Sequence, residues 1–242
     1  MKKMLLVMAA GVFVAAGTAQ AQSETVTSVN VVGYYSVTLP PAKLLMLSAP
    51  LLSFEGATLA DMFGDQLPDG TKVYIWDRSK TPAQYSSASY QSTPPFVPTP
   101  VWGGSYTNVL LPGDGFFLKT PNSGITNTVT IMGEVPAIEN DYGTNVVSNL
   151  SGLNIVSYSF PVDVVFTNTT LAADSDVQVI YLWNEQTQTY STYARQAAGF
   201  PPVPFSGNWP AGSPTIPAGR AFWVKTATSL DWTEVAPYLN NL

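Results

Sequence analysis

Short runs of β-branched and aromatic residues, many of them bounded by proline or glycine, recur along most of the chain. They lie at residues 29–39, 43–52, 72–77, 116–120, 127–135, 153–160, 178–184 and 222–226. Runs of this length and composition are typical of β-strands, and the turn sequence Pro68-Asp69-Gly70 introduces one of them. In the first half we predict one short helical turn, at 58–63, with Thr58 as its cap. The pattern therefore predicts an all-β fold with little helix.

Landmarks of the first half of the chain return in the second half in the same order. The segment 73–77 (VYIWD) matches 180–184 (IYLWN) at an offset of 107 residues, which also pairs Trp102 with Trp209. The segment 113–120 (GDGFFLKT) matches 219–226 (GRAFWVKT) at an offset of 106. Repeats of this kind indicate one structural unit present twice. We therefore predict two tandem, pseudo-repeated β-sandwich or barrel-like modules, at 22–136 and 143–242, joined by residues 137–142.

The first module opens with Val-Val-Gly-Tyr at 31–34 and a Thr-Leu-Pro segment at 38–40, which lead into the strand at 44–50. A later strand ends in Trp-Asp at 76–77, and Pro-Gly-Asp-Gly-Phe-Phe at 112–117 closes the module. This arrangement resembles a group of uncharacterised secreted bacterial proteins with two tandem β-rich modules. The resemblance implies export and the tandem layout, and it supplies no catalytic residues. The second module departs from the pattern at Arg220 and Ala221, and its opening strand, at 145–148, is expected to be shortened.

The first 21 residues have the order of a cleavable signal peptide. Two lysines precede an apolar run at 5–17, and Ala19 and Ala21 occupy the small-residue positions before a cleavage site. The apolar run is shorter than the ~20 residues that span a bilayer. We therefore expect cleavage after Ala21 and an exported mature chain with no transmembrane segment. That chain is expected to be extracellular, at the cell surface or in the periplasm.

Charged residues make up only 11% of the chain, against about 25% in an ordinary soluble domain. The whole chain has 10 Lys+Arg against 16 Asp+Glu, so removal of Lys2 and Lys3 leaves 8 against 16, a net charge of −8. Proteins that bind nucleic acid neutralise its phosphates with clustered Lys and Arg. We therefore expect no nucleic acid partner.

The sequence contains no cysteine and no histidine. Ser–His–Asp and Cys–His mechanisms are therefore impossible, and a zinc site is disfavoured. The 16 acidic residues single out no pair for glycoside hydrolysis. Asp61, Asp65 and Asp69 recur every four residues, but this spacing matches no calcium loop, and a solvated acidic edge is favoured. We predict a protein that is not an enzyme and has no cofactor and no metal site.

Aromatic side chains are the candidates for ligand or partner binding. The candidate residues are Trp102, Trp209, Tyr85, Tyr90, Tyr190 and Tyr193. For Trp102 and Trp209, core packing is an equally good interpretation, while the matched pair Trp76 and Trp183 is interpreted as packing anchors. The proline-rich segments at 93–100 and 200–205 suit either docking or a stiff surface loop, and the stiff loop is favoured.

The expected export, the repeat, the low charge and the lack of histidine and cysteine all point away from an enzyme. They favour a non-catalytic structural or interaction protein that is secreted or belongs to the cell envelope. Its expected partners are itself, through self-association, or other envelope proteins. The alternative is a pair of carbohydrate-binding modules that use exposed tryptophan and tyrosine to bind polysaccharide. A secreted hydrolase that uses carboxylates alone is a third, weaker hypothesis.

Overall fold

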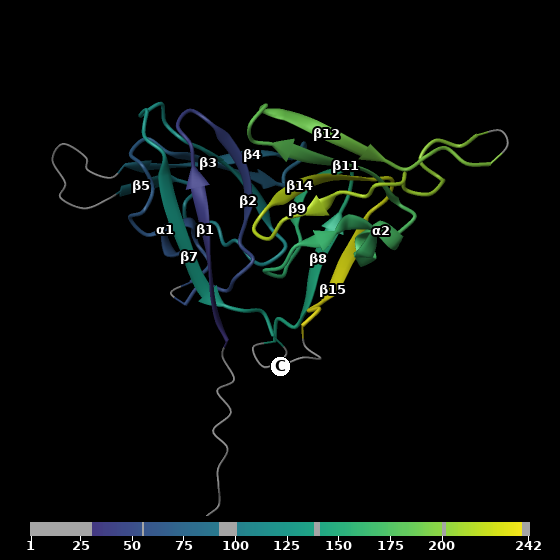
Figure 1. The fold of residues 1–242 in the computed structure, drawn as a ribbon, viewed down its shortest axis with the longest axis horizontal. Coiled ribbons are helices and arrows are strands. Elements are labelled where there is room, and N and C mark those ends of the chain that lie inside the picture. Colours follow the sequence, from purple (N-terminus) through teal and green to yellow (C-terminus); the bar gives the residue numbers. More distant parts are fainter. Residues whose placement is uncertain (1–30, 55, 92–100, 138–140, 200–201, 239–242) are drawn as a thin grey trace, which may run out of the picture.

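The computed structural model describes residues 31–54, 56–91, 101–137, 141–199 and 202–238, and within them the fold is nearly all β (Figure 1). This confirms the predicted fold class. The predicted signal peptide at 1–21 lies outside the described residues, as do residues 92–100 and 200–201 of the proline-rich segments. We call residues 31–137 the first half and residues 141–238 the second half.

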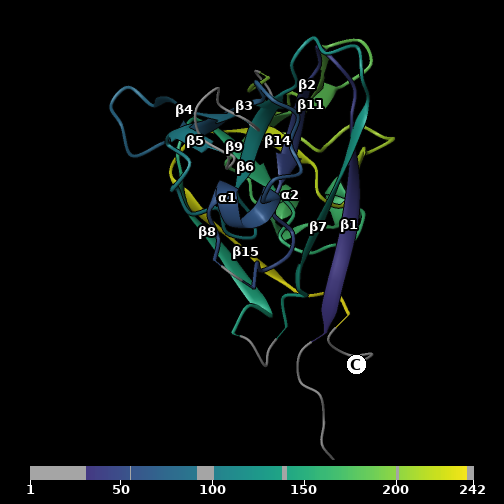
Figure 2. The same ribbon diagram turned by 90° about the vertical axis from the view of Figure 1, so that its left-hand side faces the viewer.

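The first half combines a two-stranded ribbon with a five-stranded antiparallel sheet. Its strands are β1 (Val32–Leu39), β2 (Leu44–Ser48), β3 (Lys72–Asp77), β4 (Gln84–Gln91), β5 (Val101–Gly104), β6 (Gly115–Lys119) and β7 (Asn127–Glu134). The ribbon pairs β1 with β7, and the order in the sheet is β2-β6-β3-β4-β5. Figure 2 shows the ribbon at one margin of the molecule.

The second half pairs its strands in a comparable order. Its elements are β8 (Thr144–Leu150), β9 (Leu153–Ser157), β10 (Val164–Val165), β11 (Val177–Asn184), β12 (Thr189–Ala194), β13 (Thr215–Ile216), β14 (Ala221–Thr226) and β15 (Leu230–Val235). The ribbon pairs β8 with β15, the sheet order is β9-β14-β11-β12, and β10 pairs with β13. The expectation of a shortened opening strand is wrong, because β8 has seven residues against eight in β1. Backbone pairing with β15 extends β8 beyond the apolar residues from which its length was judged.

Both helices are single short turns that begin at a threonine cap. Helix α1 (Leu59–Phe63) is capped by Thr58, whose hydroxyl accepts from the backbone N–H of Asp61 while the Asp61 carboxylate accepts from the N–H of Thr58. Helix α2 (Thr170–Ala173) is capped by Thr169, whose hydroxyl accepts from the backbone N–H of Ala172. The predicted helical turn and its cap are therefore confirmed.

Alternation along the strands of each sheet sends side chains to two different cores. In β2, Leu45 and Leu47 face the first-half core together with Val37 of β1 and Val129 of β7. The residue between them, Met46, points to the opposite face of the sheet. Because successive residues of a strand point to opposite faces, strands β2, β6, β9 and β14 are buried on both sides.

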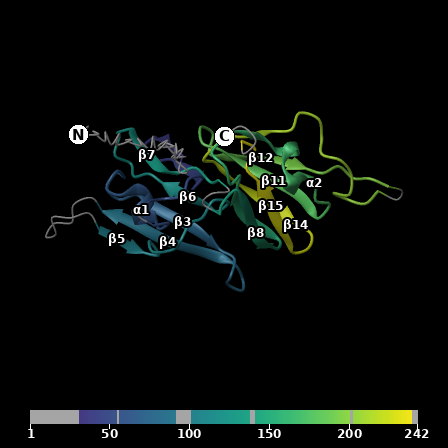
Figure 3. The ribbon, with the colours of Figure 1, turned by 90° about the horizontal axis from the view of Figure 1, so that it is seen from below.

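In each sheet, the face that points away from the core of its own half packs against the same face of the other sheet. This contact joins the halves (Figure 3). We call this joint the seam. It consists of Met46, Phe117, Ile155, Ala221 and Trp223, with Leu44, Tyr74, Trp76, Tyr181 and Trp183 packed against them. The structure therefore stacks a ribbon, a sheet, a second sheet and a second ribbon around three apolar clusters.

Candidate functional site

Contacts across the seam are reciprocal. The indole Nε1 of Trp76 donates to the carbonyl of Leu153 at 3.1 Å, and the Nε1 of Trp183 donates to the carbonyl of Leu44 at 2.7 Å. Leu153 begins β9 and Leu44 begins β2. An indole of each half therefore donates a hydrogen bond to the edge strand of the other half. Trp76 and Trp183 are thus packing anchors, as expected, but they pack at the seam.

The backbone repeats this reciprocity. The N–H of Ser48 donates to the carbonyl of Gly219 at 3.0 Å, and the N–H of Ser157 donates to the carbonyl of Gly113 at 2.9 Å. These bonds give β2 and β9 a partner on the side that faces the other half. Paired edges do not recruit further strands, so the seam protects both sheets as well as joining them.

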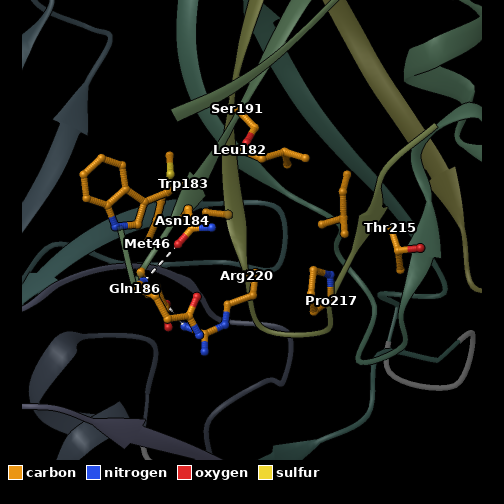
Figure 4. Close-up of a pocket in the computed structure, with 12 residues that line it drawn as sticks. Met46, Leu182, Trp183, Asn184, Gln186, Ser191, Thr215, Pro217 and Arg220 are labelled. Carbon is orange, nitrogen blue, oxygen red and sulfur yellow. Dashed lines mark hydrogen bonds and ion pairs between the residues drawn. The ribbon is translucent and has the colours of Figure 1, made fainter. Parts of the chain in front are cut away.

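Two pockets open beside the seam, one in each half. The pocket of the second half has a volume of about 330 Å³, and that of the first half about 490 Å³. Figure 4 shows the second-half pocket, with Trp183 and Met46 on one side, Thr215 and Pro217 on the other, and Arg220 near its base. Both volumes fall in the range of about 300–1,000 Å³ that is usual for small-molecule sites.

Each pocket contains one ion pair. Arg78 lies 3.5 Å from Asp114 in the first half, and Arg220 pairs with Glu185 in the second. Burial raises the pKa of Asp114 above its usual range, while a backbone hydrogen bond from Leu111 and the charge of Arg78 act in the opposite direction. Burial likewise raises the pKa of Glu185, opposed by the charge of Arg220 and by its hydrogen bond. Both carboxylates have therefore lost part of their hydration.

Sequence reasoning did not find these four charged residues as a site. A signal existed, because Arg78 and Glu185 are 107 residues apart, and Asp114 and Arg220 are 106 apart, the two offsets of the matched segments. At both matched positions the charge changes sign: Arg78 corresponds to Glu185, and Asp114 corresponds to Arg220. Such a double exchange indicates that each half has an ion pair and that the basic and acidic residues have changed places. The departure from the pattern at Arg220 is thus one member of an exchanged ion pair.

Three of the six aromatic residues predicted for binding, Tyr90, Trp102 and Trp209, pack against the apolar cores. Tyr90 is fully buried, so its ring is not available to a ligand, and Trp102 packs against it at 5.2 Å between ring centroids. Trp209 donates from Nε1 to the carbonyl of Ala172 at 2.8 Å, and its ring lies 4.9 Å from that of Phe166. Core packing therefore accounts for these three residues.

The remaining three are partly exposed. The hydroxyl of Tyr193 donates to the carbonyl of Ala211 at 3.0 Å. Tyr85 and Tyr190, which are 45% and 43% exposed, both contact Trp223 at the seam. The pKa of Tyr85 is raised to about 12, mainly by burial and further by Tyr190. The structure thus brings together two of the six predicted residues, one from each half.

Of the acidic cluster considered for calcium, Asp61 serves as the partner of the Thr58 cap. Within the described ranges, no group of three or more acidic residues is placed to hold a metal ion. In the same residues, no helix has the length and apolar character needed to cross a membrane. Comparison with family models, curated proteins and solved structures gives no significant match.

Proposed function

We propose that this is a non-catalytic, exported interaction protein that self-associates through strand β1. The observation that carries the proposal is the free outer edge of β1. Within the described part of the chain, β1 pairs only with β7. A second copy of the same strand can add to this edge through backbone hydrogen bonds, as in other cases of strand addition.

The composition of β1 supports this role. Its eight residues, VGYYSVTL, include no charge and no proline, which are the usual features that protect an edge strand. On its solvent-facing side Val32 is 60% and Tyr34 is 77% exposed, and the cross-strand partner of Tyr34, Met132, is 62% exposed. A cluster of large apolar side chains exposed in this way is typical of an interaction surface.

The corresponding strand of the second half, β8, is less suited to pairing. Its register with β15 shifts between Leu230 and Trp232, and Asn149 has a φ of 58°. Irregularities of this kind twist an edge away from further pairing. Of these two strands, β1 is therefore the one that we expect to pair, and pairing of β1 with its own copy gives a closed dimer and not a fibre.

The wider proposal includes export and duplication. The signal-peptide pattern at 1–21 supports export, and the resemblance to secreted bacterial proteins agrees with it. The comparable strand order and the reciprocal seam contacts support the interpretation of the halves as two copies of one module. Such a protein would sit in the envelope or outside the cell as a rigid building unit.

The test is the molar mass of the purified mature chain, 22–242, measured by light scattering over a wide concentration range. We expect a concentration-dependent dimer that Tyr34→Lys abolishes, because a charge on the shared edge is desolvated in the dimer. Val146→Lys, on the half-exposed outer face of β8, is the matched control and should still dimerise. A wild-type chain that stays monomeric throughout would refute self-association, as would a Tyr34→Lys variant that dimerises equally well.

A further inference from the structure

We propose that the two seam pockets are one binding site present in two copies, and that each binds a neutral sugar residue. This goes beyond self-association, because neither pocket is lined by a residue of β1. The site also differs from the one predicted from the sequence, which placed sugar binding at the second tryptophan of each half.

The two pockets have corresponding walls. Both are lined by an aliphatic residue, Ile75 in one half and Leu182 in the other, and by the adjacent indole, Trp76 or Trp183. A residue of the opposite half completes each pocket: Ile155 reaches the first-half pocket, and Met46 the second-half pocket. Since Ile155 lies in β9 and Met46 in the equivalent strand β2, the pockets exist only when the halves are joined.

The ion pairs run in opposite directions in the two pockets. The turn that follows the indole strand carries Arg78 in the first half and Glu185 in the second, and the partner at the next sheet strand is Asp114 or Arg220. A ligand with a net charge would therefore meet the opposite arrangement in the second copy. A pair of neighbouring hydroxyls suits both arrangements, because each hydroxyl can donate and accept.

Further polar groups fit the same ligand. The first-half pocket includes the side chains of Asn108 and Ser79, and the second-half pocket includes Asn184 and Ser191. The Nη1 of Arg78 is buried, and no acceptor for it is present among the described residues. Amides, hydroxyls and a spare guanidinium donor beside aliphatic and indole surface match the polar rim and apolar faces of a sugar ring.

The backbone of the pockets disfavours an extended peptide. Strands β3 and β11 each pair with a strand on both sides, β3 with β4 and β6, and β11 with β12 and β14. Strand addition, which binds many extended peptides, needs a free strand edge that these central strands do not offer. Recognition here has to come from side chains, as it does for small polar rings.

The test is calorimetric titration of the mature chain with four neutral trisaccharides: cellotriose, xylotriose, maltotriose and β-1,4-galactotriose. We expect at least one of them to bind with two sites per chain. Arg78→Ala should weaken sugar binding at the first-half pocket at least about tenfold, and Glu185→Ala should do the same at the second-half pocket. Each variant should therefore retain one site of the original affinity. Lys80→Ala, an exposed charge two residues from Arg78, is the matched control and should keep both sites.

A variant with exchanged charges tests whether the direction of the ion pair matters. Exchanging the pair in the first half, Arg78→Glu with Asp114→Arg, reproduces the arrangement of the second half and should retain two sites. Thermal unfolding of each variant shows whether the fold is intact. Self-association is tested separately, since Tyr34→Lys should leave sugar binding unchanged.

Three outcomes would overturn the proposal. The first is that none of the four trisaccharides binds. The second is stronger binding of the anionic probe trigalacturonate, the cationic probe chitosan trimer or the peptide tetraserine. The third is binding that survives combined loss of Arg78 and Glu185 in a folded protein.

Discussion

At the residue scale, the closest approach between the halves explains one difference between the matched segments. A Cβ atom added at Gly115 would lie 2.5 Å from the Cβ of Ala221 and 2.5 Å from the Cγ2 of Ile155. Contacts this short do not occur between real side chains, so β6 must have glycine where β14 has alanine. The difference between Gly115 and Ala221 in the matched segments therefore results from the close contact of β6 and β14 at the seam.

The first prediction follows from this contact. Gly115→Ala should lower the free energy of unfolding by about 1–3 kcal/mol, because the added methyl group overpacks the seam. Adding Ala221→Gly should restore part of the loss by removing the opposing methyl group. Urea unfolding of the two variants and the parent measures both effects. Equal stability of parent and Gly115→Ala, or no recovery in the double variant, would contradict this account of the seam.

Two tyrosines whose hydroxyls lose water on folding set an expected alkaline limit of stability. Burial raises the pKa of Tyr85 and of Tyr158 to about 12, with smaller contributions from Tyr190 and Glu234 respectively. In the unfolded chain these hydroxyls ionise at their ordinary pKa of 10.0. Their contribution to stability is therefore complete below about pH 10 and is lost as the pH rises to about 12.

Tyrosinate absorbance of the folded chain should accordingly rise in more than one step, with late steps near pH 12 that disappear in urea. The free energy of unfolding should fall over the same interval, and Tyr85→Phe should reduce that fall. A single step near pH 10 in the folded protein would show that Tyr85 and Tyr158 are freely hydrated.

At the element scale, the strands that could be predicted from the sequence are those with short runs of apolar, β-branched and aromatic residues. Strands β2, β3, β6, β7, β9, β11 and β14 are of this kind. Strand β4 (QYSSASYQ) has no apolar run, because small polar residues make up most of it. Its conformation is fixed by pairing with β3 on one side and with β5 on the other. Local composition therefore predicts apolar strands, wherever they lie in a sheet, better than strands made of small polar residues.

The helix caps give an element-scale prediction. Thr58→Ala should lower the free energy of unfolding by about 1 kcal/mol, because α1 loses the side-chain acceptor for the N–H of Asp61. Thr58→Ser keeps that acceptor and should be nearly neutral. Chemical unfolding compares the two variants. If alanine and serine have the same effect, the capping interaction does not stabilise α1.

At the scale of the whole molecule, the joint between the halves could not be predicted from the sequence. The repeat offset correctly singled out Trp76 and Trp183, but a matched position says nothing about which surface a side chain faces. The four charged residues of the pockets were missed for a similar reason: Arg78 and Asp114 are 36 residues apart and meet only after the sheet has formed. Contacts between segments that are distant in the chain become visible only once the topology is known.

The seam also predicts how the molecule unfolds. Its core residues include Met46, which is 2% exposed, and the reciprocal indole bonds of Trp76 and Trp183 connect the halves further. A joint with its own apolar cluster couples the stability of the parts it connects. We therefore expect the mature wild-type chain to unfold in one transition, with equal calorimetric and van't Hoff enthalpies.

Met46→Lys should break this coupling. A lysine at 46 would bury an unpaired charge in the seam, at a cost on the order of 3–5 kcal/mol, while Leu45 and Leu47 keep their places in the first-half core. Differential scanning calorimetry should then resolve two transitions, one for each half. Met132→Lys, the same substitution at a side chain that is 62% exposed, should leave a single transition. If Met46→Lys unfolds in one unshifted transition, the apolar seam does not couple the halves, and the pockets beside it would lack the rigid frame that two equal sites require.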